Sequence, residues 1–173
     1  MRATDYPYCQ SPFTVLAHRG GAGMAVNKGI ENTLAAFGHA VEVGCTYLET
    51  DVHATSDGVL VAFHDPILDR VTESGGVIAA MPWHKVKQAK VGGEPIPTLD
   101  EILDAFPEAF INIDIKHDGA TMPLFDVLSR LRAWSRVCVG SFSSKRIQTF
   151  RRLVQGRTVT AVGPVGGGWA VIG

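Results

Sequence analysis

The 173-residue chain lacks the features that mark secreted, membrane-spanning and disulfide-rich proteins. Its three cysteines, Cys9, Cys45 and Cys138, are odd in number and form no CxxC pair, so we expect free thiols rather than a disulfide framework. No uninterrupted apolar run approaches the ~20 residues of a membrane span. The first twelve residues contain no apolar core typical of an export signal. These absences favour a cytoplasmic protein without a membrane span.

The chain also lacks a large excess of charge of either sign. Lysine and arginine number 16 against 17 acidic residues, and no basic block occurs, which argues against a nucleic-acid partner. No GxGxxG motif joins the first apolar run to a helix, as a dinucleotide-binding fold requires. With 46% hydrophobic residues, the chain is long enough for one domain with a sizeable core. We expect a single domain over residues 1–173.

Strand-like and helix-like runs alternate along the chain, which is typical of a parallel sheet. Strands are predicted at 13–18, 47–55, 59–65, 109–116, 137–143 and 158–165, and helices at 31–44, 98–106, 123–134 and 144–156. Residues 66–97 are irregular and rich in proline and glycine, and we interpret them as an inserted lobe with one short helix.

Two architectures fit this alternation, a doubly wound open sheet and a TIM-type (β/α)8 barrel. Polar residues end strand after strand, and barrels collect their chemistry at the carboxyl ends of strands, so the pattern favours the barrel. Only about five barrel-type strands can be placed, whereas a complete barrel has eight. We therefore expect a barrel truncated after about five strands, with an uncovered sheet edge through which the chain would self-associate.

Acidic residues recur at strand ends. Glu49 and Asp51 share one face of a predicted strand because side chains alternate, and Asp114 and Lys116 share a face of another. Neighbouring carboxylates in a low-dielectric pocket repel each other, and a divalent cation such as Mg2+ or Ca2+ removes the conflict. Glu49, Asp51 and Asp114 are therefore candidate metal ligands. The alternative for each pair is a solvated strand end or a simple ion pair.

Two histidines end apolar runs, His18 after "VLA" and His64 after "VAF", so both should reach the same rim of the sheet. Imidazole titrates near neutral pH, which suits one ring to accept a proton and the other to donate one. Arg19 and Lys116 are cations suited to phosphate, and the glycines after Arg19 would let the backbone approach a ligand. The set predicts a metal-assisted phosphate-ester site, although a structural histidine and an ordinary salt bridge are the competing interpretations.

Several separated motifs across residues 13–163 occur in the order typical of one known family. They are "AHRGG", "IENTLAAFGHAVEVGCTYLETDVHATSDGVLVAFHD", "GEPIPTLDEILDAFP" and "NIDIK". In these motifs the chain resembles the glycerophosphodiester phosphodiesterase family. The resemblance implies a TIM barrel of the PLC-like phosphodiesterase kind, with a small insertion after the second strand. It also implies metal-dependent cleavage of glycerophosphodiesters to an alcohol and glycerol 3-phosphate, within lipid and glycerol metabolism.

The resemblance assigns roles by position. It implies acid/base catalysis by His18 and His64, phosphate contacts by Arg19 and Lys116, metal ligation by Glu49, Asp51 and Asp114, and substrate contacts by Glu31 and Asn32 of the "ENT" motif. Many family members have Glu where this chain has Asp114, and a proline is usual where it has Ile30.

Two rival functions remain. One is that of the related phospholipase D-like toxins that act on sphingomyelin, which the missing export signal and unpaired cysteines disfavour. The other is a catalytically silent partial barrel, a remnant or binding module, which the missing strands favour. The order of the two histidines, the attacking group, the alcohol and the metal are left open by the sequence.

Overall fold

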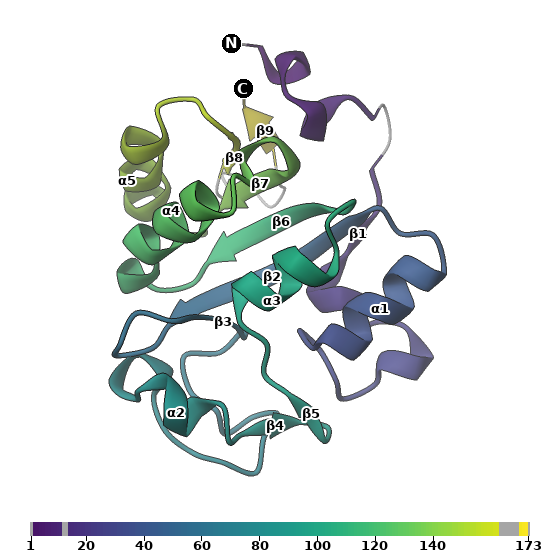
Figure 1. Ribbon diagram of the computed structural model, residues 1–173, viewed down its shortest axis with the longest axis vertical. Coiled ribbons are helices and arrows are strands. Elements are labelled where there is room, and N and C mark those ends of the chain that lie inside the picture. The colour runs from purple at the N-terminus through teal and green to yellow at the C-terminus, as the bar shows by residue number, and fades with distance from the viewer. Residues whose placement is uncertain (1, 12–13, 163–169, 173) are drawn as a thin grey trace.

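A mainly parallel sheet forms the centre of the computed structural model, which describes residues 2–11, 14–162 and 170–172 (Figure 1). Its strands are β1 (Leu16–Ala17), β2 (Tyr47–Ala54), β3 (Leu60–Ala62), β6 (Phe110–Ile115), β7 (Val137–Gly140), β8 (Val159–Val162) and β9 (Ala170–Ile172). In the described residues the order is β1-β2-β6-β7-β8-β9, with β3 paired to β2. The run from β1 to β8 is parallel at every step, which confirms the five barrel-type strands.

Four helices connect these parallel strands and cover one face of the sheet (Figure 1). They are α1 (Leu34–Glu42), α3 (Leu99–Ala105), α4 (Thr121–Arg130) and α5 (Ser144–Val154). Every predicted helix is present, with ends displaced by a few residues. Thr33 caps helix α1, because its Oγ1 accepts a hydrogen bond from the Ala36 amide at 3.2 Å.

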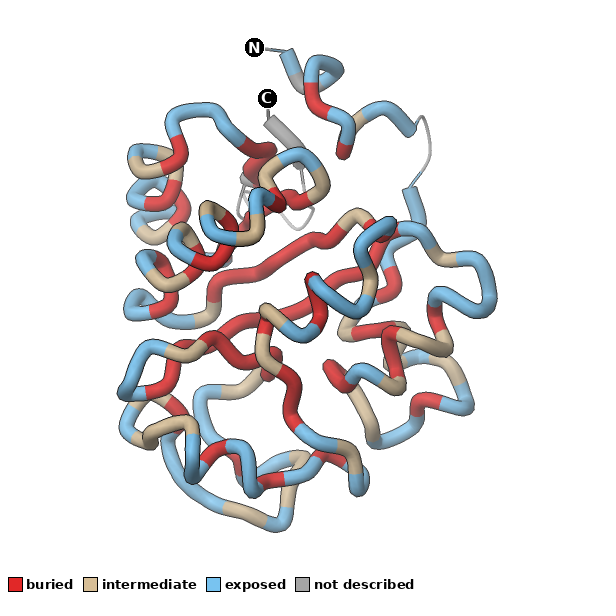
Figure 2. Tube along the Cα trace, viewed as in Figure 1, coloured by how far each residue is buried: buried red, intermediate tan, exposed pale blue. Residues whose placement is uncertain are grey.

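The main core lies between the sheet and these helices, where buried residues are concentrated along the strands (Figure 2). Ile111, Ile113 and Ile115 alternate along β6 and pack in the same cluster as side chains of all four helices. Because successive side chains of a strand point to opposite faces, Asn112 and Asp114 lie on the other face. Burial of the isoleucines thus turns the polar residues of β6 inward, toward the barrel axis.

The N-terminal residues cover the amino-terminal end of this inner face. Tyr8, in a 3-10 turn (Pro7–Cys9), packs its ring edge-on against Tyr47 and Phe110, with centroids 5.2 and 5.8 Å away. The Tyr47 hydroxyl donates to the Tyr8 carbonyl at 2.9 Å, and the Tyr6 hydroxyl donates to the Gly156 carbonyl at 2.8 Å. The amino-terminal end of the inner face is therefore apolar and filled, which leaves the carboxyl end for a pocket.

Residues 66–97 lie at the lower end of the view in Figure 1. They contain α2 (Trp83–Val86), which is the one short helix expected there, and a small hairpin of β4 (Lys90–Val91) and β5 (Glu94–Pro95). The segment has its own buried cluster, which includes Leu68, Ile78 and Val86 and joins Phe63 after β3. Strand β3 runs antiparallel to β2 and brings His64 back toward the carboxyl end of the sheet.

The first and last predicted strands differ in length from the strands that the structure describes. The first strand is shorter than 13–18, since β1 covers only Leu16–Ala17, and residue 13 is outside the described part. The last predicted strand, 158–165, corresponds to β8, with residues 163–165 also outside it. Strand β8 pairs antiparallel with β9, so within the described residues the two ends of the sheet order are β1 and β9.

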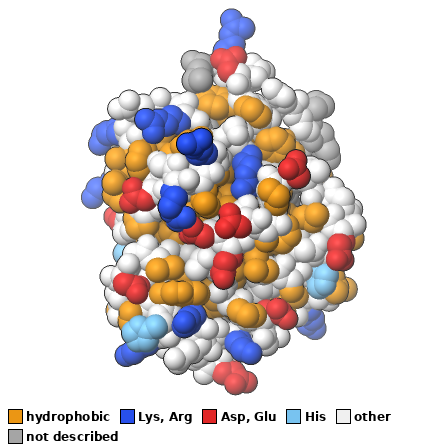
Figure 3. Space-filling view, viewed as in Figure 1, with side chains coloured by type: hydrophobic (Ala, Val, Ile, Leu, Met, Phe, Trp, Pro, Cys, Tyr) orange, Lys and Arg blue, Asp and Glu red, His pale blue; other side chains and the backbone are white. Residues whose placement is uncertain are grey.

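The surface shows acidic, basic and hydrophobic side chains intermingled on the face drawn in Figure 3. Among the described residues, no helix is both long enough and apolar enough to cross a lipid bilayer.

Candidate active site

A pocket of about 290 Å³ opens at the carboxyl ends of β1, β2 and β6. Its lining contains seven of the nine predicted site residues: His18, Arg19, Glu49, Asp51, His64, Asp114 and Lys116. The remaining two, Glu31 and Asn32, contact members of that set from beside the pocket. Residues almost 100 positions apart in the chain therefore meet at one rim, as the parallel topology requires.

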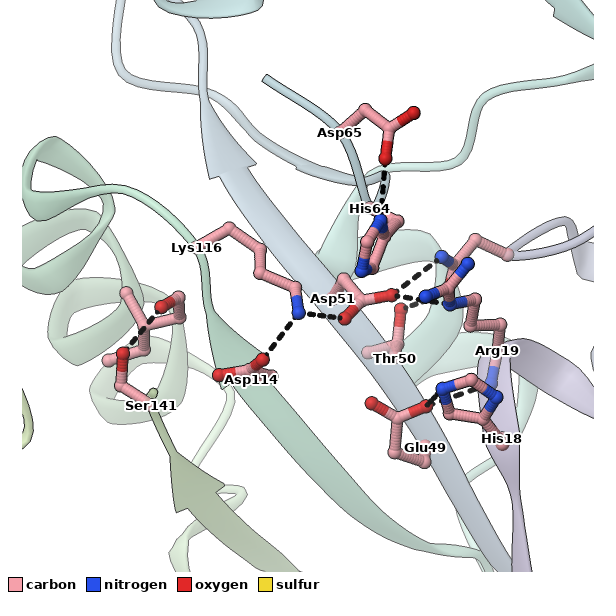
Figure 4. Close-up of polar contacts among 12 residues, drawn as sticks. His18, Arg19, Glu49, Thr50, Asp51, His64, Asp65, Asp114, Lys116 and Ser141 are labelled. Atoms are coloured by element: carbon pink, nitrogen blue, oxygen red, sulfur yellow. Dashed lines mark hydrogen bonds and ion pairs between the residues drawn. The ribbon is translucent and has the colours of Figure 1, made fainter. Parts of the chain in front are cut away.

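Asp51 and Asp114 face each other across β2 and β6, where they are register partners. Lys116 lies between them: its Nζ is 2.9 Å from Oδ1 of Asp51 and 2.6 Å from Oδ2 of Asp114 (Figure 4). Glu49 is two residues before Asp51 on the same face, opposite Asn112. Three buried carboxylates thus share a small volume with one ammonium group.

Burial is the largest influence on the pKa values of Glu49, Asp114 and Lys116. Loss of water, and then the charge of Asp51, raises the pKa of Glu49 to about 8. Burial likewise raises the pKa of Asp114, against the opposing effect of Lys116. For Lys116, burial lowers the pKa, but the hydrogen bond with Asp114 and the charge of Asp51 outweigh it, and the net direction is upward. Burial therefore disfavours negative charge on Glu49, Asp51 and Asp114 all at once.

His18 and Arg19 occupy a tight turn directly after β1. His18 Nε2 lies 3.9 Å from Oε2 of Glu49, and burial followed by the charge of Arg19 lowers the pKa of this histidine. The Arg19 amide donates to the same Glu49 oxygen at 2.8 Å. Its side chain reaches across to Asp51, with Nε 3.5 Å from Oδ2. Arg19 adopts a left-handed φ of 51°, a conformation unusual for a residue other than glycine and often found at functional sites.

Gly20 has a packing role in the structure, and the expected approach of a ligand to the backbone here stays a prediction. Its φ is +75°, and a Cβ there would lie 3.1 Å from both the Phe37 ring and the Phe37 amide of α1. The glycine therefore allows the His18–Arg19 turn to pack against the helix. Asn27 fixes this loop, because its side-chain amide donates to the carbonyls of Gly20 and Ala36 at 3.0 and 3.2 Å. His39 Nδ1 lies 2.7 Å from the Asn27 side-chain oxygen.

His64 approaches the pocket from the end of β3. Its Nδ1 lies 2.6 Å from Oδ1 of Asp65, and the ring extends from there toward Asp51 (Figure 4). Hydrogen bonds from Arg70 and His64 outweigh the effect of burial and lower the pKa of Asp65, so this group is a carboxylate at neutral pH. A carboxylate only accepts, so Nδ1 carries the hydrogen and Nε2 is the nitrogen left for the pocket.

Glu31 and Asn32 hold the pocket residues in place. Glu31 Oε1 accepts from Nη1 of Arg19 at 3.2 Å. Asn32 is buried, donates from Nδ2 to Oδ2 of Asp51 at 3.1 Å, and accepts from the Thr50 hydroxyl at 2.9 Å. A direct contact of either residue with a substrate stays a prediction.

The predicted metal ligands can be tested against the geometry of the donors. Among the described residues, no group of three His, Cys, Asp or Glu side chains stands in an arrangement that could hold a metal ion as it is. Lys116 occupies the space between Asp51 and Asp114. However, Oδ1 of Asp114 is buried without a hydrogen-bond partner, and Glu49 is destabilised as an anion. Oxygen donors that lack sufficient positive charge fit a hard divalent cation.

Sequence reasoning missed three residues of the lining, Leu16, Asn112 and Phe142. Asn112 could have been found, since it is two positions before Asp114 and so shares its face. Phe142 follows β7, and its ring lies 5.1 Å from Nζ of Lys116. No periodic signal in the sequence marks Leu16 or Phe142 as pocket residues.

Residues 18–159, which include all nine predicted site residues, match the model of the glycerophosphoryl diester phosphodiesterase family. The chain belongs to this family. It is 38% identical over 149 residues to "Probable glycerophosphodiester phosphodiesterase 2" of Mycobacterium tuberculosis, a match that covers 86% of this chain and 55% of that protein. It is 31% identical over 155 residues to a glycerophosphodiester phosphodiesterase of Caldanaerobacter subterraneus, covering 80% and 62%.

A solved family structure gives the same fold. An Oleispira antarctica phosphodiesterase, determined in complex with the product sn-glycerol-3-phosphate, superposes with a TM-score of 0.77 at 27% identity, covering 92% of this chain and 70% of that one. The fold is accordingly part of the family's TIM barrel. The chain spans 55% and 62% of the length of the two sequence relatives it matches.

Proposed function

We propose that the chain is a phosphodiester hydrolase that cleaves glycerophosphodiesters to an alcohol and glycerol 3-phosphate. The observation that carries this proposal is the convergence of two imidazoles, two cations and three carboxylates on one pocket. Such a group suits an anionic phosphorus centre, because its cations stabilise developing negative charge while the imidazoles move protons. Membership of the family supports the same reaction class.

Glu49, Asp51 and Asp114 would hold a divalent cation, Mg2+ or Ca2+. When bound, the ion would polarise a phosphoryl oxygen and neutralise charge in the transition state. Glu49 would lose its proton on binding, because a nearby divalent charge favours the carboxylate form.

Arg19 and Lys116 would bind the phosphate oxygens. Arg19 is anchored by Glu31 and Asp51, which hold its planar guanidinium at the pocket wall. Lys116 would turn from the Asp51–Asp114 pair toward the substrate when a cation takes its place. Its contact with the Phe142 ring favours a position near the pocket mouth. The glycerol hydroxyls would lie on the side of Glu31 and Asn32.

His18 and His64 would exchange protons with the attacking and leaving oxygens at Nε2. The His64 ring is oriented by Asp65 in the manner of an acid–base histidine with a carboxylate partner. His18 is exposed and lies next to Glu49. One ring accepts and the other donates, and the geometry serves either order.

Turnover of glycerophosphocholine tests the proposal. The purified chain should release glycerol 3-phosphate and choline with Mg2+ or Ca2+ present, and should lose that activity in chelator and regain it when the ion returns. Release of ceramide phosphate from sphingomyelin in place of this reaction would favour the toxin-like specificity. A folded chain without turnover at any concentration of either ion would favour the silent partial barrel.

Self-association through a bare sheet edge is a separate proposal. Within the described residues the sheet order ends at β1 and β9, and exposed Val15 and Leu16 lie at the β1 end. Size-exclusion chromatography at several protein concentrations tests it, and a concentration-independent monomer would exclude it.

A further inference from the structure

Arg70 is a charged residue of segment 66–97 that the proposed chemistry does not use. Its guanidinium contacts two carboxylates at once. Nε donates to Oδ2 of Asp65, while Nη2 and Nη1 donate to Oε1 and Oε2 of Glu31 at 2.5 and 3.5 Å. Asp65 and Glu31 are 34 positions apart in the chain and belong to different loops. Arg70 therefore joins two separate walls of the site.

Each of these carboxylates contacts a residue of the pocket through its other interactions. Asp65 uses Oδ1 for Nδ1 of His64, at 2.6 Å, and Glu31 uses Oε1 for Nη1 of Arg19, at 3.2 Å. The contacts form one continuous chain from His64 through Asp65, Arg70 and Glu31 to Arg19. The histidine on one wall and the phosphate-binding cation on the other are thus connected through a residue outside the pocket.

Arg70 matters for the orientation of the two carboxylates more than for the stability of the fold. An exposed ion pair contributes little to folding, and the Arg70 side chain is 45% exposed. However, a planar guanidinium fixes the direction of the groups that it binds, which an ammonium cannot do. Without Arg70, Asp65 and Glu31 would lose a shared cation and repel each other. Asp65 would then be free to rotate away from His64.

We propose that Arg70 is a positioning residue that holds Asp65 against His64 and Glu31 against Arg19, and so sets the orientation of both pocket walls. This inference rests on the proposed function for its kinetic consequence, but its structural consequence is independent of turnover. It also gives segment 66–97 a role in the site: the segment supplies the connection between the two walls.

Kinetics provides the first test. Arg70→Gln should lower kcat for glycerophosphocholine about 10- to 100-fold, because a small misplacement of a proton-transfer group is costly. Arg70→Lys should recover only part of this loss, since an ammonium cannot bind both carboxylates in a fixed fork. Arg130→Gln is the matched control, because Arg130 also pairs with a carboxylate, Asp100 at 2.5 Å, on the helical surface. A kcat for Arg70→Gln equal to that of the control would overturn the inference.

Nitrogen NMR of the His64 ring provides the second test, without substrate or added metal and at a pH where the ring is neutral. The chain with its natural residues should show the Nδ1–H tautomer of His64. Arg70→Gln should shift the ring nitrogen signals toward a tautomer mixture, as Asp65→Asn should, and Arg130→Gln should leave them in place. Signals that do not move in Arg70→Gln would overturn the inference. An inactive chain would refute the proposed function, and the ring signals would still decide the role of Arg70.

Discussion

Asp51 and Asp114 are register partners on neighbouring parallel strands, and one ammonium group, that of Lys116, contacts both carboxylates. All three side chains are largely removed from water, with exposures of 2%, 1% and 17%. Two buried carboxylates this close require a cation, either a lysine or a metal ion. The same pair could therefore be satisfied in two ways, which is the physical basis of the proposal that a divalent ion takes the place of Lys116.

Substitution of Lys116 tests this exchange. Lys116→Met should lower the free energy of unfolding by about 3–5 kcal/mol in chelator at neutral pH, because it leaves two buried charges without a partner. Mg2+ or Ca2+ should raise the melting temperature of the variant more than that of the unaltered chain. Lys85→Met, at an exposed position of α2, is the control for loss of a lysine. A melting temperature of Lys116→Met equal to that of the control would contradict the expectation.

The pH dependence of stability tests the environment of Glu49. Its pKa in the folded state is about 8, above the ordinary value of 4.5, so the folded protein binds the extra proton. The contribution of Glu49 is therefore fully present below about pH 4.5 and is lost as the pH rises to about 8. Thermal melts in chelator at pH 5 and pH 8 should show a fall that Glu49→Gln reduces by at least ~3 °C. Glu42→Gln, at an exposed position of α1, should leave the fall unchanged.

Removal of either pocket histidine tests the acid–base assignment. His18→Ala and His64→Ala should each lower kcat by about 10²–10⁴-fold, the usual contribution of a general acid or base. Both variants should keep the circular dichroism spectrum of the unaltered chain, since neither ring is part of the core clusters. His84→Ala removes an exposed histidine of α2 and is the matched control. Retention of more than a tenth of the activity in either pocket variant would argue against the assignment.

Substitutions in the N-terminal turn test whether it fills the amino-terminal end of the inner face of the sheet. Tyr8→Ala should lower the free energy of unfolding by about 3–5 kcal/mol, because the ring is buried against Tyr47 and Phe110. Tyr47→Phe removes only the 2.9 Å hydrogen bond to the Tyr8 carbonyl and should cost about 1 kcal/mol. Urea unfolding measures both. A loss for Tyr8→Ala no larger than that for Tyr47→Phe would show that the N-terminal turn does not contribute to the core.

Local patterns predicted much of the fold because each depends on neighbours in the chain. The alternation in β2 and β6 placed Glu49 with Asp51 and Asp114 with Lys116, and the parallel connections placed all four at one end of the sheet. The capping box of α3, between Thr98 and Glu101, is another local feature. By contrast, the contacts of Asn32 with Asp51 and Thr50 join residues 18 or more positions apart, and no local pattern predicts them.

The sequence by itself determined the family, the five parallel strands and the set of polar residues that meet at one rim, because periodicity and motif order are properties of the chain alone. Only the tertiary structure decided that Lys116 pairs with both Asp51 and Asp114, and that Tyr8 fills the amino-terminal end of the inner face. It alone also decided that Arg70 joins Asp65 to Glu31. These relationships depend on distances between loops and strands that are remote in the chain, and packing of the whole domain sets those distances.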